Sequence, residues 1–168
     1  IAAHSGNNIF VGTNAGYASS GSEYSNFIGR HAGKNTSGIT YSNALGRDCL
    51  ENSTTSAYNN AIGYAAGKDT DLSNYNEFIG YRAGESSAVV NRSVTIGYNA
   101  GYNLQNTNDS VYIGNRAGFE GDSGDTNVCI GYFAGSNING DNNIYLGYYA
   151  GGNSSGSNNI EIVTNATA

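Results

Sequence analysis

The sequence contains no Pro, Met or Trp, and residues that build a conventional hydrophobic core are scarce. Leu, Ile, Val and Phe together account for 30 of the 168 residues, a share below the ~20% that is associated with disordered chains. An ordinary packed globular core is therefore nearly excluded. Charged residues make up only 12% of the chain, whereas solvated disordered tails are usually highly charged. Something other than a conventional core must order this sequence.

Positive charge is also scarce, with 7 Lys and Arg against 13 Asp and Glu and a net charge of −6. A nucleic-acid partner is disfavoured, because too few cations are present to replace the counterions of a phosphate backbone. No apolar run approaches the ~20 residues of a membrane span, so we expect no membrane insertion in this segment. No basic-then-apolar leader opens it either. The length suits one domain or one part of a longer chain.

What the sequence does contain is a short repeat built on glycine. An aliphatic residue followed by Gly recurs every 17 residues, with one final step of 16. We call these glycines the coil glycines: Gly12, Gly29, Gly46, Gly63, Gly80, Gly97, Gly114, Gly131 and Gly147. A second Gly, preceded by Ala, follows four residues after each one, except that Cys49 and Leu50 stand in the third repeat. The unit reads Asn/Ser-x-x-Ile-Gly-x-x-Ala-Gly and continues into a polar loop.

A period of 17 is too short for a pair of helices, and two glycines in every unit disfavour helix. The repeat instead predicts an all-β fold, a parallel β-solenoid of about nine and a half coils stacked ~4.8 Å apart. We expect one strand to end before each coil glycine and a second to lie around Ala-Gly. Residues 1–168 then form a single repeat domain, in which 1–6 finish an earlier coil. Residues 160–168 begin a tenth coil or a transition to a following domain, with Val163 in the glycine place.

Two columns of side chains are expected to point to opposite sides of the first strand. The aliphatic residue before each coil glycine is expected to face Ala across a thin interior. The residue two before it is expected to face outward as a seam between chains. That second column contains Phe10, Phe27, Ala44, Ala61, Phe78, Thr95, Tyr112, Cys129 and Tyr145. Each coil has few large apolar side chains, and their burial offsets little of the conformational entropy that its backbone loses on folding. Packing against other chains is therefore expected.

The repeat unit resembles the head repeats of trimeric autotransporter adhesins, the β-roll of the YadA type, and similar repeats of bacteriophage tail fibres. The resemblance covers essentially the whole chain and implies a left-handed coil and a homotrimeric fibre. The 17-residue coil is longer than the coil of the adhesin heads, and Ala-Gly replaces their more variable second turn. The longer loop is similar to virion-fibre repeats, so the resemblance does not distinguish a virion fibre from a bacterial surface adhesin.

No catalytic constellation emerges from the remaining residues. His4 and His31 lie in different loop registers and are expected to be solvated surface side chains. The carboxylates Asp69, Asp71, Glu120, Asp122, Asp125 and Asp141 are scattered along the coils, although residues 122–125 could bind a cation weakly. Cys49 and Cys129 are close to five coils apart, too far for a disulfide within one chain. We therefore expect no enzyme activity, no cofactor and no metal site.

Tyrosine is the most conspicuous surface residue. One column follows the coil glycines and contains Tyr64, Tyr81, Tyr98, Tyr132 and Tyr148, interrupted by Asn115; a second precedes the strands and contains Tyr24, Tyr41, Tyr58 and Tyr75. The first column is a candidate surface for contact with host glycans, because aromatic faces can stack on sugar rings. The favoured alternative is that the rings stack on one another or fill a seam between chains. Asn8, Asn59, Asn76, Asn127 and Asn143 are expected to form an amide ladder in the turns before the strands.

The sequence as a whole favours a structural segment of an extracellular homotrimeric fibre, on a virion or a bacterial surface, that projects or forms a host-attachment surface. Its partners would be two further copies of itself and a host cell-surface glycan or protein. One alternative is a self-assembling filament in which coils of successive subunits stack end to end. A less favoured alternative is a single-chain β-helix enzyme that acts on polysaccharide.

Overall fold

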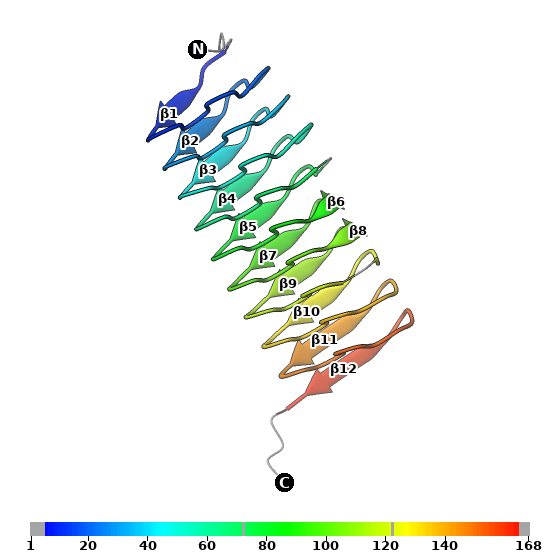
Figure 1. Ribbon diagram of the computed structural model, residues 1–168. Helices are drawn as coiled ribbons and strands as arrows, with labels where there is room; N and C mark the ends of the chain where they lie inside the picture. The colour runs from blue at the N-terminus through cyan, green and yellow to red at the C-terminus, as the bar shows by residue number, and fades with distance from the viewer. Residues whose placement is uncertain (1–5, 72, 122, 165–168) are drawn as a thin grey trace.

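The computed structural model describes residues 6–71, 73–121 and 123–164, and this part of the chain is all-β, with no helix. The coils stack into a rod, and each coil contributes one strand to a single parallel sheet (Figure 1). The strands, in spatial order, are β1 Ile9–Val11, β2 Asn26–Ile28, β3 Asn43–Leu45, β4 Asn60–Ile62, β5 Glu77–Ile79, β7 Val94–Ile96, β9 Val111–Ile113, β10 Val128–Ile130, β11 Ile144–Gly147 and β12 Ile160–Val163. The predicted parallel β-solenoid is confirmed.

The register of the sheet follows the sequence period directly. Phe10 pairs with Phe27, one 17-residue coil later, and this offset holds until β10. From β10 onward the offset is 16, so that Cys129 pairs with Tyr145. The last strand places Val163 opposite Gly147, which is the position of a tenth coil glycine. Residues 165–168 lie outside the described residues.

The second strand of each coil does not lie around Ala-Gly, and that prediction is wrong. In the coil of Gly29 this segment is a turn in which every second residue, His31, Gly33 and Asn35, has a φ of 56° to 60°. Left-handed residues at that spacing interrupt an extended strand. The backbone still bonds to both neighbouring coils, since His31 N–H donates to Thr13 O (2.9 Å) and Gly33 N–H to Cys49 O (2.9 Å).

The second wall of the rod is instead formed by residues that lie six to nine positions before the coil glycines. Two strands there, β6 Ala88–Asn91 and β8 Gln105–Asn108, pair in parallel. Isolated parallel bridges continue the wall in other coils, for example Ser20 with Ser37 and Asn139 with Ser155. Hydrogen bonds from coil to coil therefore run along both walls.

The interior is filled by the column that was expected to face outward, so the predicted orientation of the strands is wrong. Phe27 is completely buried, whereas Ile28, the neighbouring aliphatic residue, is 40% exposed. The cause is the second glycine of each coil. A Cβ at Gly33 would lie 2.3 Å from Cδ2 of Phe27, so only Gly leaves room for the ring. The buried Ala residues pack in the same interior, as expected.

In the third coil, the large and the small residue of the interior exchange places. It has Ala44 in place of the large inner residue and Leu50 in place of the second glycine, and both are completely buried. In the next coil Ala61 is also small, and the space beside Gly67 is taken by Leu50 and Phe78 from the adjacent coils. A large side chain is thus always present, but it comes from different positions in different coils, which keeps the interior close-packed.

The coil glycines are required by the stacking of coils. At Gly46 the φ is +139°, and an added Cβ would lie 2.3 Å from the carbonyl oxygen of Gly63 in the next coil. Neighbouring coils therefore approach more closely here than any side chain allows.

Buried Asn and Ser side chains form a polar ladder inside the turn before the strands. Asn59 Oδ1 accepts from Asn76 N–H (2.9 Å), and Asn76 Nδ2 donates to Val90 O (2.7 Å). Near the C-terminal end the amides also bond to each other, as Asn143 Nδ2 does to Asn127 Oδ1 (3.1 Å). The expected ladder exists, but most of its bonds are to backbone groups, which satisfies buried N–H and C=O groups.

The packing of the Phe27 ring against Gly33 predicts that Gly→Ala destabilises the fold by different amounts at two glycines with similar φ, Gly33 (+60°) and Gly38 (+68°). Both substitutions place a Cβ on a left-handed residue, but Gly38 has no atom within 4 Å of that Cβ. We expect Gly33→Ala to lower the free energy of unfolding by about 1–3 kcal/mol more than Gly38→Ala, because it overpacks Phe27. Urea unfolding followed by circular dichroism measures the difference, and equal losses would contradict the inward placement of Phe27.

Candidate functional site

The most unusual surface of the rod is the outer side of the long sheet. The residue before each coil glycine points to solvent, and this column is aliphatic in every coil: Val11, Ile28, Leu45, Ile62, Ile79, Ile96, Ile113, Ile130, Leu146 and, at the tenth position, Ile162. The exposed fraction is 42% for Ile62 and 65% for Ile162. Ile79, Ile96, Ile113 and Leu146 are half-buried, and the others are exposed. An apolar stripe of this length that reaches solvent marks an interaction surface.

A second outward column lies two residues earlier in each strand. From β2 to β5 it is an amide ladder, in which Asn26 donates to Asn43 (2.8 Å), Asn43 to Asn60 (2.8 Å) and Asn60 to Glu77 (2.7 Å). From β7 to β12 the column is aliphatic: Val94, Val111, Val128, Ile144 and Ile160. We call the two columns together the outward sheet face. A shallow groove runs along its first half, between the aliphatic and amide residues.

The predicted tyrosine column is exposed and forms two ring stacks. Ring centroids are 5.0 Å apart from Tyr64 to Tyr81 and from Tyr81 to Tyr98, and 5.2 Å apart from Tyr132 to Tyr148. Asn115 separates the two stacks. Tyr24, Tyr41, Tyr58 and Tyr75 form a third stack, with centroids 4.7–4.9 Å apart.

Stacking changes what these tyrosines can offer to a ligand. Tyr81 has a ring on each of its faces, yet it is 44% exposed, so ring edges and hydroxyls are what solvent meets. Sugar rings pack on aromatic faces, and inside a stack those faces are covered. At the C-terminal end the rings also meet edge to face, as Tyr148 and Tyr149 do at 4.8 Å. A ligand on this column would therefore contact edges and hydroxyl groups.

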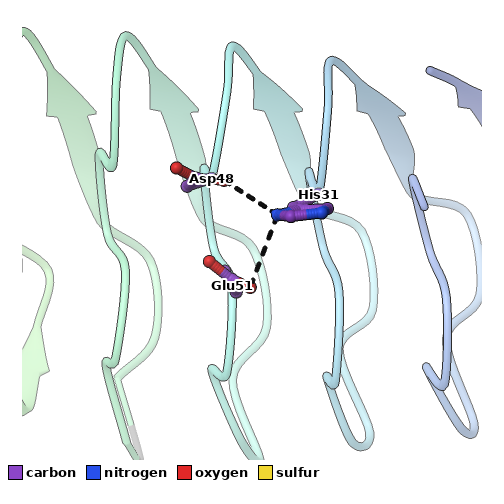
Figure 2. A group of neighbouring side chains, drawn as sticks. All are labelled: His31, Asp48 and Glu51. Carbon is purple, nitrogen blue, oxygen red and sulfur yellow. Dashed lines mark hydrogen bonds and ion pairs between the residues drawn. The ribbon is translucent and has the colours of Figure 1, made fainter. Parts of the chain in front are cut away.

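A charged cluster lies on the turns of the second and third coils (Figure 2). His31 Nδ1 is 3.2 Å from Asp48 Oδ1 and 3.9 Å from Glu51 Oε1. The side chain of His31 is only 19% exposed, so its expected role as a solvated surface residue is wrong. His4 lies outside the described residues. The coil register could have revealed this cluster, because His31 and Asp48 both follow a coil glycine by two positions.

Two cations complete the cluster. Lys34 Nζ is 3.1 Å from Glu51 Oε1, and Arg47 Nε is 3.0 Å from Asp48 Oδ2. Lys34 and Glu51 belong to a column, five residues after each coil glycine, that continues with Lys68 and Glu85 and so alternates in sign.

The other candidate groups are not brought together in the described part of the chain. Asp125 N–H donates to Asp141 Oδ1 (2.9 Å), which uses one of these carboxylates as a turn acceptor. Asp122 of the weak cation-site prediction lies outside the described residues. Cys49 and Cys129 are free thiols, as predicted, and burial raises the pKa of Cys49 to about 11 and that of Cys129 to about 12. Both thiols are therefore protonated at neutral pH, which makes them poor nucleophiles.

The chain matches no protein-family model, and a search of the curated proteins finds no match for it either. The resemblance to adhesin heads and tail fibres therefore stands on the repeat unit alone and stays a prediction. Over the residues that the structure describes, no helix has the length and apolar character needed to cross a membrane.

The tyrosine stacks predict a stability effect that depends on position. We expect Tyr81→Leu, which removes two ring contacts, to lower the free energy of unfolding by about 1–3 kcal/mol. Tyr17 is 61% exposed and stacks on no ring in the described chain, so Tyr17→Leu should change it by less than about 0.5 kcal/mol. Thermal unfolding of the two variants measures the difference. A loss at Tyr17 as large as at Tyr81 would contradict stabilisation by stacking.

Proposed function

We propose that this chain is a structural segment of an extracellular homotrimeric fibre that projects or forms a host-attachment surface. The observation that carries the proposal is the outward sheet face, in which the column before the coil glycines is aliphatic from β1 to β12. Of its two columns, only Glu77 carries a charge. Such a face is costly to leave in water, and a partner that covers it gains the corresponding hydrophobic free energy.

A second and third copy of the chain are the partners that suit this face best. The ladder repeats at the spacing of the coils, so a partner must present apolar groups at the same spacing over the same length, about 45 Å for the stacked strands. Parallel copies of the same rod meet that condition. Identical copies of one chain usually assemble with closed symmetry, and the resemblance to trimeric fibres indicates a ring of three.

The mechanical role follows from the bonding between coils. Backbone hydrogen bonds join each coil to the next along both walls, for example Gly63 N–H to Leu45 O (3.0 Å) and Tyr58 N–H to Thr40 O (3.0 Å). Between β1 and β12, successive strands of the long sheet are separated by a constant step of 17 or 16 residues. A rod of this kind resists bending and presents few sites for proteases, which suits a spacer or a projecting fibre.

The attachment role is assigned to the exposed tyrosine edges, with a host glycan as the expected ligand class. Tyr64, Tyr81, Tyr98, Tyr132 and Tyr148 present hydroxyl groups in a row, and hydroxyls both donate and accept hydrogen bonds to sugar hydroxyls. The end-to-end filament is the second candidate, because the strand register at β12 continues the coil pattern. The polysaccharide-cleaving enzyme has less support, since the sequence offers no catalytic constellation.

The homotrimer is tested by the mass of the particle in solution, from light scattering coupled to size exclusion. We expect about 52 kDa, three times the 17.4 kDa of the chain, with resistance to heating. Ile62→Asp with Ile130→Asp should give a folded species of lower mass, because both side chains point outward and are 40–42% exposed. The added carboxylates would have to be buried without partners in the trimer.

The control is Thr55→Asp with Asn106→Asp, which adds the same charge to the second wall, where both residues are exposed. This variant should keep the mass of the unsubstituted chain. A monomeric unsubstituted chain would overturn the trimer and favour the single-chain solenoid, whereas open-ended polymers would favour the filament.

The attachment surface is tested separately by binding of the fibre to arrays of host-type glycans. We expect Tyr132→Phe with Tyr148→Phe to lose binding, because the substitutions keep the ring stack and remove only the hydroxyls. Tyr24→Phe, in the other stack, serves as the matched control. Binding that survives loss of both hydroxyls would exclude this column as the contact surface.

A further inference from the structure

We propose that His31, Asp48 and Glu51 form a binding site for a divalent transition-metal ion, for which Zn²⁺ is the suitable probe. The site joins two consecutive coils, since His31 follows Gly29 and both carboxylates follow Gly46. The proposal goes beyond the fibre function and does not depend on the oligomeric state. It is the one group of three or more His, Cys, Asp or Glu side chains within the described residues whose ligand atoms all lie within 4.8 Å of one another.

The distances between the ligand atoms suit a small tetrahedral ion. Zn–N and Zn–O bonds of about 2.0–2.2 Å place the ligands of a tetrahedral ion about 3.3 Å from each other. His31 Nδ1 is 3.2 Å from Asp48 Oδ1 and 3.9 Å from Glu51 Oε1. Figure 2 shows the imidazole directed between the two carboxylates. An ion placed among the three groups would draw the Glu51 carboxylate closer to the imidazole.

The ligands are held in place by the coil stacking. His31 N–H donates to Thr13 O (2.9 Å) and Asp48 N–H donates to Arg30 O (2.9 Å), so the backbone of these two ligands is fixed to the preceding coil. Glu51 O accepts from Asp69 N–H (2.8 Å), which fixes the third ligand to the following coil. The side chains are also largely buried, with 10% of Asp48 and 11% of Glu51 exposed. Binding would therefore cost little ordering of side chains, which is the condition for a preorganised site.

The neighbouring Lys and Arg side chains contact one of the two carboxylate ligand atoms and not the other. Arg47 bonds to Oδ2 of Asp48, which leaves Oδ1 directed toward the imidazole. Lys34 Nζ instead contacts Glu51 Oε1 (3.1 Å), the same atom that approaches His31. A divalent ion must displace this ammonium group, and it brings one more positive charge than Lys34 supplies to the two buried carboxylates.

The donor set favours a transition metal over calcium. One imidazole nitrogen and two carboxylate oxygens suit Zn²⁺ and its first-row neighbours, whereas Ca²⁺ takes six to eight oxygen ligands. Three protein ligands leave a fourth position for water. Because the ligands come from two coils, a bound ion would cross-link the rod at this level.

Isothermal titration of metal-free protein with ZnCl₂ tests the site. We expect saturable binding of one ion per chain, and a loss of affinity of at least about tenfold in His31→Ala and in Glu51→Gln. Lys34→Gln should bind more tightly than the unsubstituted chain, because it removes the competing ammonium group. Asp109→Asn is the matched control, since Asp109 is a carboxylate that is ion-paired with Arg92 elsewhere on the rod, and it should leave binding unchanged.

A simple ion-pair cluster would give a different pattern, with no saturable heat in the unsubstituted chain or in Lys34→Gln. Either that result, or Zn²⁺ binding that is unaffected by His31→Ala, would overturn the proposal. The gain expected for Lys34→Gln cannot arise from misfolding, which keeps the test decisive if a ligand variant folds poorly. Titration with Co²⁺ gives an independent readout, because nitrogen and oxygen ligation in a tetrahedral site produces visible d–d absorption.

Discussion

Close contact between the backbones of successive coils is the constraint on which this structure depends. At the coil glycines, one turn of the chain lies so near the next that a single methyl group could not be inserted. The carbonyl and amide groups of each coil are thereby brought within bonding distance of the next one, over both walls. Order in this chain comes mainly from a repeated backbone contact, which explains how so few large apolar residues suffice.

Once the coils are fixed at this spacing, described residues at equivalent positions of successive coils lie next to each other. Tyrosines stack on tyrosines and amides bond to amides because the fold places them in the same column. The exposed aliphatic ladder arises in the same way. An apolar residue at one outward position is unremarkable on a globular surface, but its repetition in every coil produces a continuous strip.

The sequence period was sufficient to predict the solenoid, the strand before each coil glycine, the register and the absence of a disulfide between Cys49 and Cys129. It misplaced the second strand, because the left-handed residues of the Ala-Gly turn leave no trace in the hydropathy pattern. It did not determine which side of the strand faces inward, because alternation says only that Phe27 and Ile28 point in opposite directions. The deciding contact, between Phe27 and Gly33, joins residues that a pattern of hydropathy does not connect. One signal was present, since Ala44 and Leu50 deviate together in one coil. The cluster of His31, Asp48 and Glu51 could also be predicted from the sequence, once the turn positions of successive coils are aligned on their coil glycines.

The column that alternates Lys34, Glu51, Lys68 and Glu85 has a consequence for how the rod reaches its native order. Because the coils are similar, the chain could misfold by leaving one coil out of the stack. The two coils on either side would then pack on each other with their glycines still in register. Such an error would place Lys34 on Lys68, and Glu51 on Glu85, at one-coil spacing. Like charges at that distance repel one another. Over these four coils, the alternating signs therefore disfavour the stacking of one coil on the wrong neighbour.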